Sequence, residues 1–151
     1  MDNTNEVIQQ FIVFKLEKQL FGIDIQNVQI IEKMKPIMRV PKVPICVKGV
    51  MNLRGEIIPV INLREEFEIE SIDYTDKTRI IIVRLEEAMV GIIVDEVKEV
   101  VEIAQYQIEA IQNIQGKIKS NHILGVVKVD DSIVTLLSLN NIIEEAFDTG
   151  K

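Results

Sequence analysis

The chain repeats itself. Residues 10–33 align without a gap on residues 79–102, and 20 of the 24 aligned pairs agree as apolar, polar or glycine. Unrelated sequences of such composition would agree at roughly half of the positions. Residues 49–63 match residues 125–139 in the same way. Because a repeat of this kind means that one supersecondary unit is built twice, we expect two related lobes at about 10–66 and 79–139.

Short apolar runs dominate both copies. Runs of four to eight residues, rich in Ile and Val and bounded by Gly, Pro, Asn or Asp, are typical of β-strands. The expected strands are 11–16, 20–25, 28–33, 47–53, 57–63, 79–85, 89–95, 99–103, 123–129 and 133–139. The pattern changes only at the end, where apolar residues spaced by three and four predict a helix over 139–148, with Ser138 or Asn140 as its cap. The sequence therefore predicts an all-β fold with a short C-terminal helix.

Charge and composition exclude several classes of protein. The net charge is −7, and Lys and Arg do not form the continuous clusters that track phosphates, so binding to nucleic acid or directly to an anionic membrane is disfavoured. A single cysteine, Cys46, cannot form an internal disulfide and fits a reducing compartment. No secretory signal or membrane-length apolar run is present. We expect a cytoplasmic protein.

The sequence gives little support for an enzyme. It has none of the glycine-rich, nucleophile-elbow or metal-binding motifs, and His122 stands alone without a cluster at ligand spacing. Cys46 lies among apolar neighbours and is better explained as a small core residue. We expect no catalytic residue, cofactor or metal. A hydrolase with two separated carboxylates and a small nucleic-acid-binding barrel remain rival hypotheses.

The stretch VMNLRGEIIPVINL, residues 50–63, contains the most informative asymmetry. The repeat aligns Arg54-Gly55 with Asp130-Asp131, which indicates a hairpin turn in both copies. Gly55 is expected to supply the positive φ of that turn. Neither the turn nor the flanking strands require an arginine. Arg54 is therefore either a solvated turn residue or an anchor for a partner's carboxylate.

These residues resemble the CheW family of bacterial chemotaxis coupling proteins. The likeness covers residues 8–147 and rests on the block GVMNLRGEIIPVINL followed by VGIIVDEV. It implies one domain of two intertwined SH3-like five-stranded β-barrels, with strand exchange near the termini possible. It also implies a non-enzymatic adaptor that joins the cytoplasmic tip of chemoreceptors to the regulatory domain of the histidine kinase CheA. The alternative is a small β-barrel protein-binding module of another signalling function.

The resemblance also implies which residues meet the receptor, in an apolar groove between the lobes. They are Val28, Ile30, Lys48, Gly49, Arg54, Val97 and Val100. Ile30 stands where the family often has a glutamate within reach of the NLRG arginine. The intramolecular partner of Arg54 is therefore left open, with Glu32 and Glu56 as the alternatives.

Overall fold

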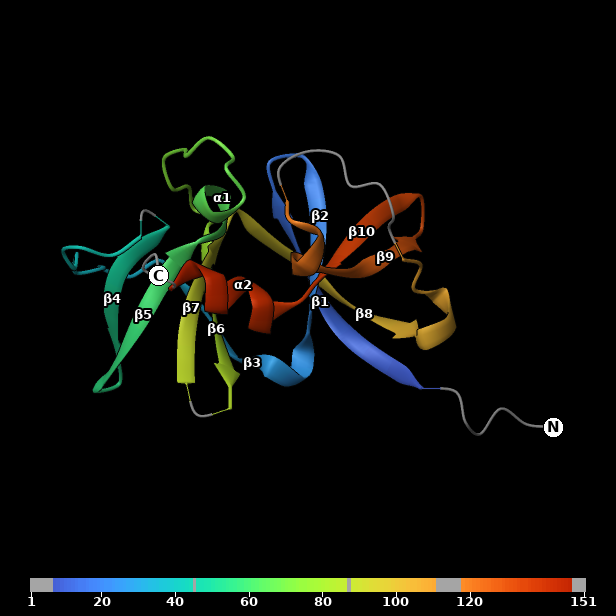
Figure 1. The fold of residues 1–151 in the computed structure, drawn as a ribbon, viewed down its shortest axis with the longest axis horizontal. Coiled ribbons are helices and arrows are strands. Elements are labelled where there is room, and N and C mark those ends of the chain that lie inside the picture. The colour runs from blue at the N-terminus through green and yellow to red at the C-terminus, as the bar shows by residue number, and fades with distance from the viewer. Residues whose placement is uncertain (1–6, 45, 87, 111–117, 148–151) are drawn as a thin grey trace.

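A computed structural model describes residues 7–44, 46–86, 88–110 and 118–147. Within these ranges ten strands form two five-stranded sheets, which lie side by side in Figure 1. Sheet A has the order β8–β1–β2–β10–β9, and sheet B has the order β3–β6–β7–β5–β4. The strands are β1 (Ile8–Leu16), β2 (Gln19–Asp24), β3 (Val28–Lys33), β4 (Val47–Leu53), β5 (Glu56–Asn62), β6 (Arg79–Leu85), β7 (Ala88–Val94), β8 (Glu96–Ala104), β9 (Ile123–Val129) and β10 (Ser132–Leu137).

In the described part of the chain, five short helical segments connect or follow these strands. The α-helices are α1 (Leu63–Glu66) and α2 (Leu139–Ala146), and the 3-10 turns are η1 (Ile25–Asn27), η2 (Gln105–Gln107) and η3 (Ser120–His122). All ten expected strands are present, and the predicted C-terminal helix is found. Ser138 occupies its N-cap position but makes no side-chain cap bond. The all-β fold with a short C-terminal helix is thus confirmed.

The two sheets do not coincide with the two copies of the repeat. Sheet A combines β1 and β2 of the first copy with β8, β9 and β10 of the second, and sheet B combines β3, β4 and β5 of the first copy with β6 and β7 of the second. The exchange uses two parallel pairings, Leu136 beside Gly22 and Val60 beside Gly91, which are equivalent positions of the repeat. The exchange, which the resemblance left possible near the termini, takes place inside each copy, after β2 and after β7. Only Asp95 separates β7 in sheet B from β8 in sheet A.

Each sheet remains open rather than closing into a continuous barrel. A single bridge joins the segment after β3 to β4, where Met38 and Val50 exchange two backbone hydrogen bonds of 2.8 and 2.9 Å. The equivalent bridge in sheet A joins Glu109 to Val126, with both bonds 2.8 Å long. Expected barrel closure is therefore reduced to one bridge per sheet among the described residues.

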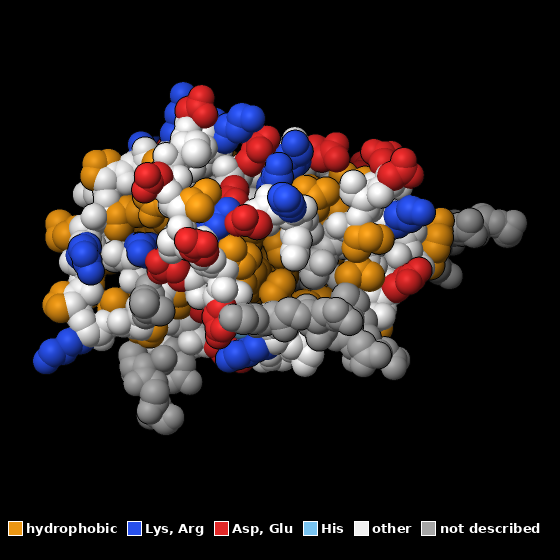
Figure 2. Space-filling view, turned by 90° about the horizontal axis from the view of Figure 1, so that it is seen from above, with side chains coloured by type: hydrophobic (Ala, Val, Ile, Leu, Met, Phe, Trp, Pro, Cys, Tyr) orange, Lys and Arg blue, Asp and Glu red, His pale blue; other side chains and the backbone are white. Residues whose placement is uncertain are grey.

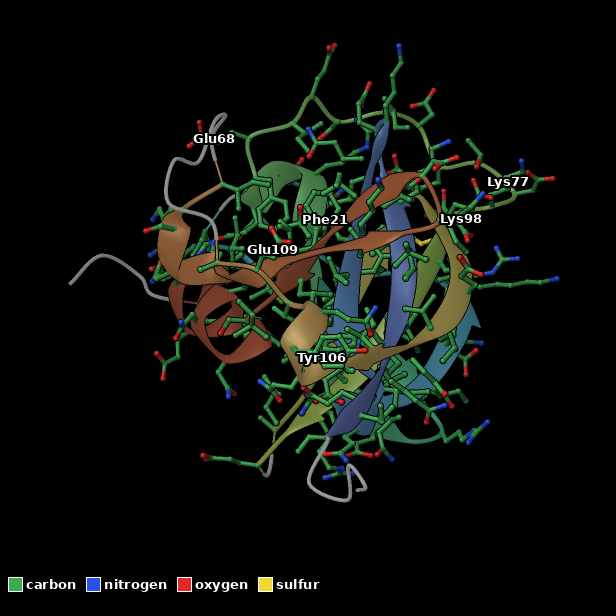
Figure 3. All side chains as sticks on the ribbon, turned by 90° about the vertical axis from the view of Figure 1, so that its right-hand side faces the viewer. Phe21, Glu68, Lys77, Lys98, Tyr106 and Glu109 are labelled. Atoms are coloured by element: carbon green, nitrogen blue, oxygen red, sulfur yellow. The ribbon has the colours of Figure 1, made fainter. Side chains whose placement is uncertain are left out.

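The largest apolar core lies between the two sheets. It takes buried side chains from both, including Phe14 and Phe21 of sheet A and Ile81 and Ile92 of sheet B. Helix α2 covers this junction with Leu139, Ile142 and Ala146, its buried face. Figure 3 shows Phe21 inside the molecule and Lys77 and Lys98 pointing away from it. Two smaller cores fill the individual sheets.

Candidate protein-binding site

Arg54 lies in the two-residue turn that joins β4 to β5. Leu53 pairs with Glu56, and the two residues between them have positive φ, 54° at Arg54 and 88° at Gly55. Positive φ at both central positions is the signature of the type I′ turn, whose twist matches that of the flanking strands. The Gly55 amide donates to Oδ1 of Asn52 at 2.9 Å, which fixes the turn. The expectation that Gly55 has a positive φ is confirmed.

The guanidinium of Arg54 takes no part in holding this turn. Its side chain is exposed, and no hydrogen bond or ion pair joins it to any residue that the structure describes. Neither expected partner reaches it: Glu32 pairs instead with Lys35, at 3.6 Å between Nζ and Oε1, and Glu56 is an exposed turn-flanking residue. Arg54 thus presents an uncommitted planar donor group to solvent.

Val28 and Val97, which are equivalent in the repeat, lie at the starts of β3 and β8, each of which is an outer strand of its sheet. Both are half-buried and pack against the core between the sheets. Ile30 packs against the core of sheet B, whereas Val100 on β8 is 48% exposed. Among the strands of the described residues, β3 pairs only with β6, and β8 pairs only with β1. Each outer strand therefore has one unpaired edge next to these side chains.

The space between the sheets is mainly packed core. A hollow of about 190 Å³ at their boundary is lined largely by polar residues, among them Lys15, Glu17 and Thr78. Larger hollows lie beside β4 and the segment that precedes it. The apolar groove between the lobes, like the receptor contacts assigned to it, stays a prediction.

Lys48 and Gly49 have structural roles of their own. The Lys48 ammonium pairs with Glu65, with its Nζ 3.2 Å from Oε2. Gly49 has φ of 144°, and a Cβ placed there would lie 2.0 Å from the carbonyl oxygen of Met38. Because only glycine leaves room for that bridge, Gly49 is explained by the fold before any partner is considered.

Sequence reasoning missed Arg64, a buried arginine that makes several hydrogen bonds and ion pairs. Arg64 in α1 is 5% exposed. Its Nε lies 2.9 Å from Oδ1 of Asp95, its Nη2 lies 2.7 Å from Oδ2 of the same residue, and Nη2 also lies 2.6 Å from Oε1 of Glu17. Glu17 belongs to the β1–β2 turn of sheet A. Arg64 thus ties sheet A to the crossing point between the sheets.

The ionisation of Asp95 reflects this contact. Burial is the largest single influence and raises the pKa of Asp95, but hydrogen bonds from Arg64 and from the Glu17 amide outweigh it, and the pKa lies below its ordinary value. In turn, the hydrogen bond with Asp95 raises the pKa of Arg64. The repeat aligns Arg64 with Asn140 and Asp95 with Gln26. The two copies of the repeat therefore differ at these positions, as they do at Arg54.

The surroundings of His122 differ from the expectation of an isolated histidine. Its buried ring stands beside Glu66 of α1 and Glu145 of α2, with Nε2 3.0 Å from Oε1 of Glu145, because the fold joins segments that are distant in sequence. Glu145 also accepts from Lys119 and Asn121, and the Asn121 hydrogen bond is the largest of several influences that lower its pKa to about 2. Lys119 already neutralises this carboxylate. We call Glu145 together with Lys119, Asn121 and His122 the Glu145 clasp, because these contacts hold α2 against η3.

Cys46 agrees with the expectation of a small core residue. The residue is 5% exposed, and its Sγ lies 3.7 Å from the Ala146 carbonyl oxygen. Burial, followed by the effect of Glu66, raises the pKa of Cys46 to about 12. A thiol with this pKa is protonated at neutral pH and is a poor nucleophile.

No helix within the described residues is both long and apolar enough to span a membrane.

Comparison with known proteins finds one family over nearly the whole chain. The CheW-like domain family matches residues 10–147. The chemotaxis protein CheW of Thermotoga maritima is 33% identical over 147 residues, covering 96% of this chain and 95% of that protein. The chemotaxis protein CheW of Bacillus subtilis is 32% identical over 137 residues, covering 91% of this chain and 88% of the relative.

A solved structure shows the same likeness. The crystal structure of a scaffolding protein, the CheW of Thermoanaerobacter tengcongensis, superposes with a TM-score of 0.83 at 32% identity, covering 94% of this chain and 92% of that chain. At this identity and coverage the likeness extends beyond the fold to the family.

Proposed function

Because the chain belongs to the CheW family of chemotaxis proteins, a family of scaffolds, we propose that it couples chemoreceptors to the histidine kinase CheA. In this proposal it is a non-enzymatic adaptor with two docking surfaces. One receives the cytoplasmic tip of a methyl-accepting chemoreceptor, and the other receives the regulatory domain of CheA. The adaptor works in the cytoplasm and reaches the membrane only through these partners, without cofactor, metal or nucleic acid.

The observation that carries the receptor surface is the state of Arg54. The backbone and Asn52 hold the turn without the Arg54 side chain, whose exposed guanidinium no described residue engages. Arginine presents a fork of donors suited to a carboxylate, and binding such a group costs little here because no internal ion pair has to be broken. This favours Arg54 as the charged contact that fixes the register of a receptor helix.

The proposed apolar part of the surface uses the two outer strands. Val28 and Ile30 on β3 and Val97 and Val100 on β8 place apolar side chains next to unpaired strand edges. Lys48 and Gly49 belong to the same set by resemblance, although the fold already explains Gly49. An apolar surface of this kind suits the apolar stripe of an amphipathic helix. Two modest contacts on one adaptor would reinforce each other in an array through effective concentration.

Calorimetric titration of the intact chain with a receptor-tip fragment, and separately with the CheA regulatory domain, tests the proposal. We expect saturable binding to both partners. Arg54→Glu should abolish the receptor isotherm and leave the kinase isotherm unchanged. Arg84→Glu makes the same change of charge at an exposed arginine of β6 and should alter neither.

Binding of neither partner would contradict the proposal and favour a module of another signalling function. Loss of both isotherms in Arg54→Glu, with the fold intact, would contradict the assignment of Arg54 to the receptor surface alone.

A further inference from the structure

Charge is distributed very unevenly along this acidic chain. Residues 33–55 contain six of the 17 basic residues and none of the 24 acidic ones. The remaining sequence therefore carries all of the excess negative charge. Blocks of one sign mark surfaces that attract the opposite sign, especially where the rest of the protein repels it.

The structure gathers part of this stretch around two adjoining hollows beside β4. One, of about 660 Å³, is lined by residues 39–44, 47 and 48. The other, of about 440 Å³, is lined by residues 34–37 together with Arg39, Lys48 and Tyr74. Arg39 and Lys48 border both hollows. We call the surface formed by Met34, Lys35, Arg39, Val40, Lys42 and Lys48 the basic face.

The basic face combines uncommitted charge with exposed apolar side chains. Arg39 and Lys42 are exposed, and neither makes an ion pair with a described residue. Close by, Met38 is 71% exposed and Tyr74 is 45% exposed. Figure 2 shows hydrophobic and basic side chains together at the left-hand end of the molecule, where β4 lies in Figure 1, with acidic side chains further to the right.

The segment is also held in a defined shape. Pro36, Pro41 and Pro44 restrict its backbone, and the Met38–Val50 bridge fastens it to β4. Gly49 permits that close approach. A surface that is already ordered loses less conformational entropy when a partner binds, and this makes a modest contact more favourable.

We propose that the basic face binds an acidic segment of a partner protein, with an apolar side chain of that segment entering a hollow and its carboxylates meeting Arg39 and Lys42. Charge complementarity selects an acidic partner, and the exposed Met38 and Tyr74 favour one that also carries apolar groups. A concave surface fits a protruding protein segment better than a flat bilayer. The basic face shares Lys48 with the residues assigned to the receptor, but Arg39 and Lys42, which carry the proposal, lie outside that set.

The test titrates the ¹⁵N-labelled intact chain with a synthetic peptide in which a Leu-Phe pair is flanked by Glu and Asp residues. Amide shifts should saturate and concentrate in residues 34–48 and near Tyr74. Arg39→Glu/Lys42→Glu should weaken binding by about tenfold or more. Lys77→Glu/Lys128→Glu makes an equal change of net charge at exposed lysines elsewhere and should leave binding unchanged.

Two peptide controls and one vesicle control complete the experiment. A peptide with Gln and Asn in place of the acids and one with Ser in place of Leu-Phe should each bind more weakly. Absence of shifts with the acidic peptide, or equal weakening by the two double variants, would overturn the proposal. So would binding to phosphatidylglycerol–phosphatidylcholine vesicles that depends on Arg39 and Lys42 while the peptide does not bind. The dispersion of the amide spectrum verifies that every variant is folded.

Discussion

Arg64 and Asp95 form a two-pronged ion pair at the point where the chain passes from sheet B to sheet A. The two contacts are 2.9 and 2.7 Å long, and the Arg64 side chain is 6% exposed against 20% for Asp95. Oδ2 of Asp95 also accepts the Glu17 amide of the β1–β2 turn at 2.8 Å. The pair therefore links α1, the crossing residue and the neighbouring sheet, and it fixes how the two sheets meet.

Removing one member of this partly buried pair should destabilise the fold strongly. In Arg64→Leu the partly buried Asp95 carboxylate loses its counter-charge, and we expect a loss of about 3 kcal/mol in the free energy of unfolding. Urea denaturation of the native chain and of Arg64→Leu measures this loss. The matched control is Arg84→Leu, which removes an exposed arginine and should cost about 0.5 kcal/mol or less. Equal effects of the two substitutions would contradict the structural role of Arg64.

The Glu145 clasp predicts a dependence of stability on acid pH. Its hydrogen bonds lower the pKa of Glu145 from 4.5 to about 2, so the ionised carboxylate favours the folded state. A lowered folded-state pKa gives stability that is complete above the unfolded value and lost as the pH falls through the folded value. The stability difference between the native chain and Glu145→Gln should therefore shrink between about pH 4.5 and 2, as measured by urea unfolding at several pH values. A difference that stays constant across this range would show that Glu145 is not clasped.

Gly49 and Gly55 both have positive φ but should differ in their tolerance of a side chain. Ala at position 49 would bring Cβ to 2.0 Å from the Met38 carbonyl oxygen, whereas nothing lies within 4 Å of a Cβ at position 55. Gly49→Ala should cost roughly 2 kcal/mol or more, through steric overlap and strain together. Gly55→Ala should cost about 1 kcal/mol, through strain alone. Thermal unfolding of both variants measures the difference.

This comparison also bears on how receptor-binding data are interpreted. If Gly49→Ala loses receptor coupling and stability together, the result reports damage to the Met38–Val50 bridge rather than a lost contact. An unchanged stability in that variant would contradict the structural explanation and would return Gly49 to the set of contact residues.

Unlike Gly49→Ala, a substitution of Arg54 should weaken receptor binding without a loss of stability. Its side chain makes no described contact, and alanine fits the same turn position, so Arg54→Ala should change the free energy of unfolding by about 0.5 kcal/mol or less. The same variant should weaken binding of the receptor-tip fragment. A large loss of thermal stability would mean that the guanidinium supports the fold, and the assignment of Arg54 to the receptor surface would be wrong.

The repeat made the strands and turns predictable, because alternating apolar residues and equivalent turn residues are local properties. The pairing of the strands was not predictable in the same way. Alternation indicates which face of a strand is buried, but β2 could satisfy that requirement beside β3 or beside β10. The decisive contacts are the parallel pairings at Gly22 and Gly91, which join residues more than 30 positions apart.

The candidate site shows the same division between local and long-range information. The turn at Arg54 followed from the repeat, since its geometry depends only on neighbouring residues. The burial of Arg64 did not, because a charged residue in an acidic connection has the sequence character of a solvated one. Its partners are 31 positions away at Asp95 and 47 positions away at Glu17. His122 likewise meets Glu145 only through the packing of α2.

The reciprocal exchange of strands also affects how the protein is made. β1 and β2 leave the ribosome first, but the three strands that complete their sheet are the last of the ten. Sheet B is closer to completion earlier, since its final strand is β7, yet its apolar face also packs against sheet A. The nascent chain therefore carries Phe11, Phe14 and Phe21 without their sheet A neighbours until β8, β9 and β10 have been made. Neither copy of the repeat, expressed by itself, contains all the strands of a sheet.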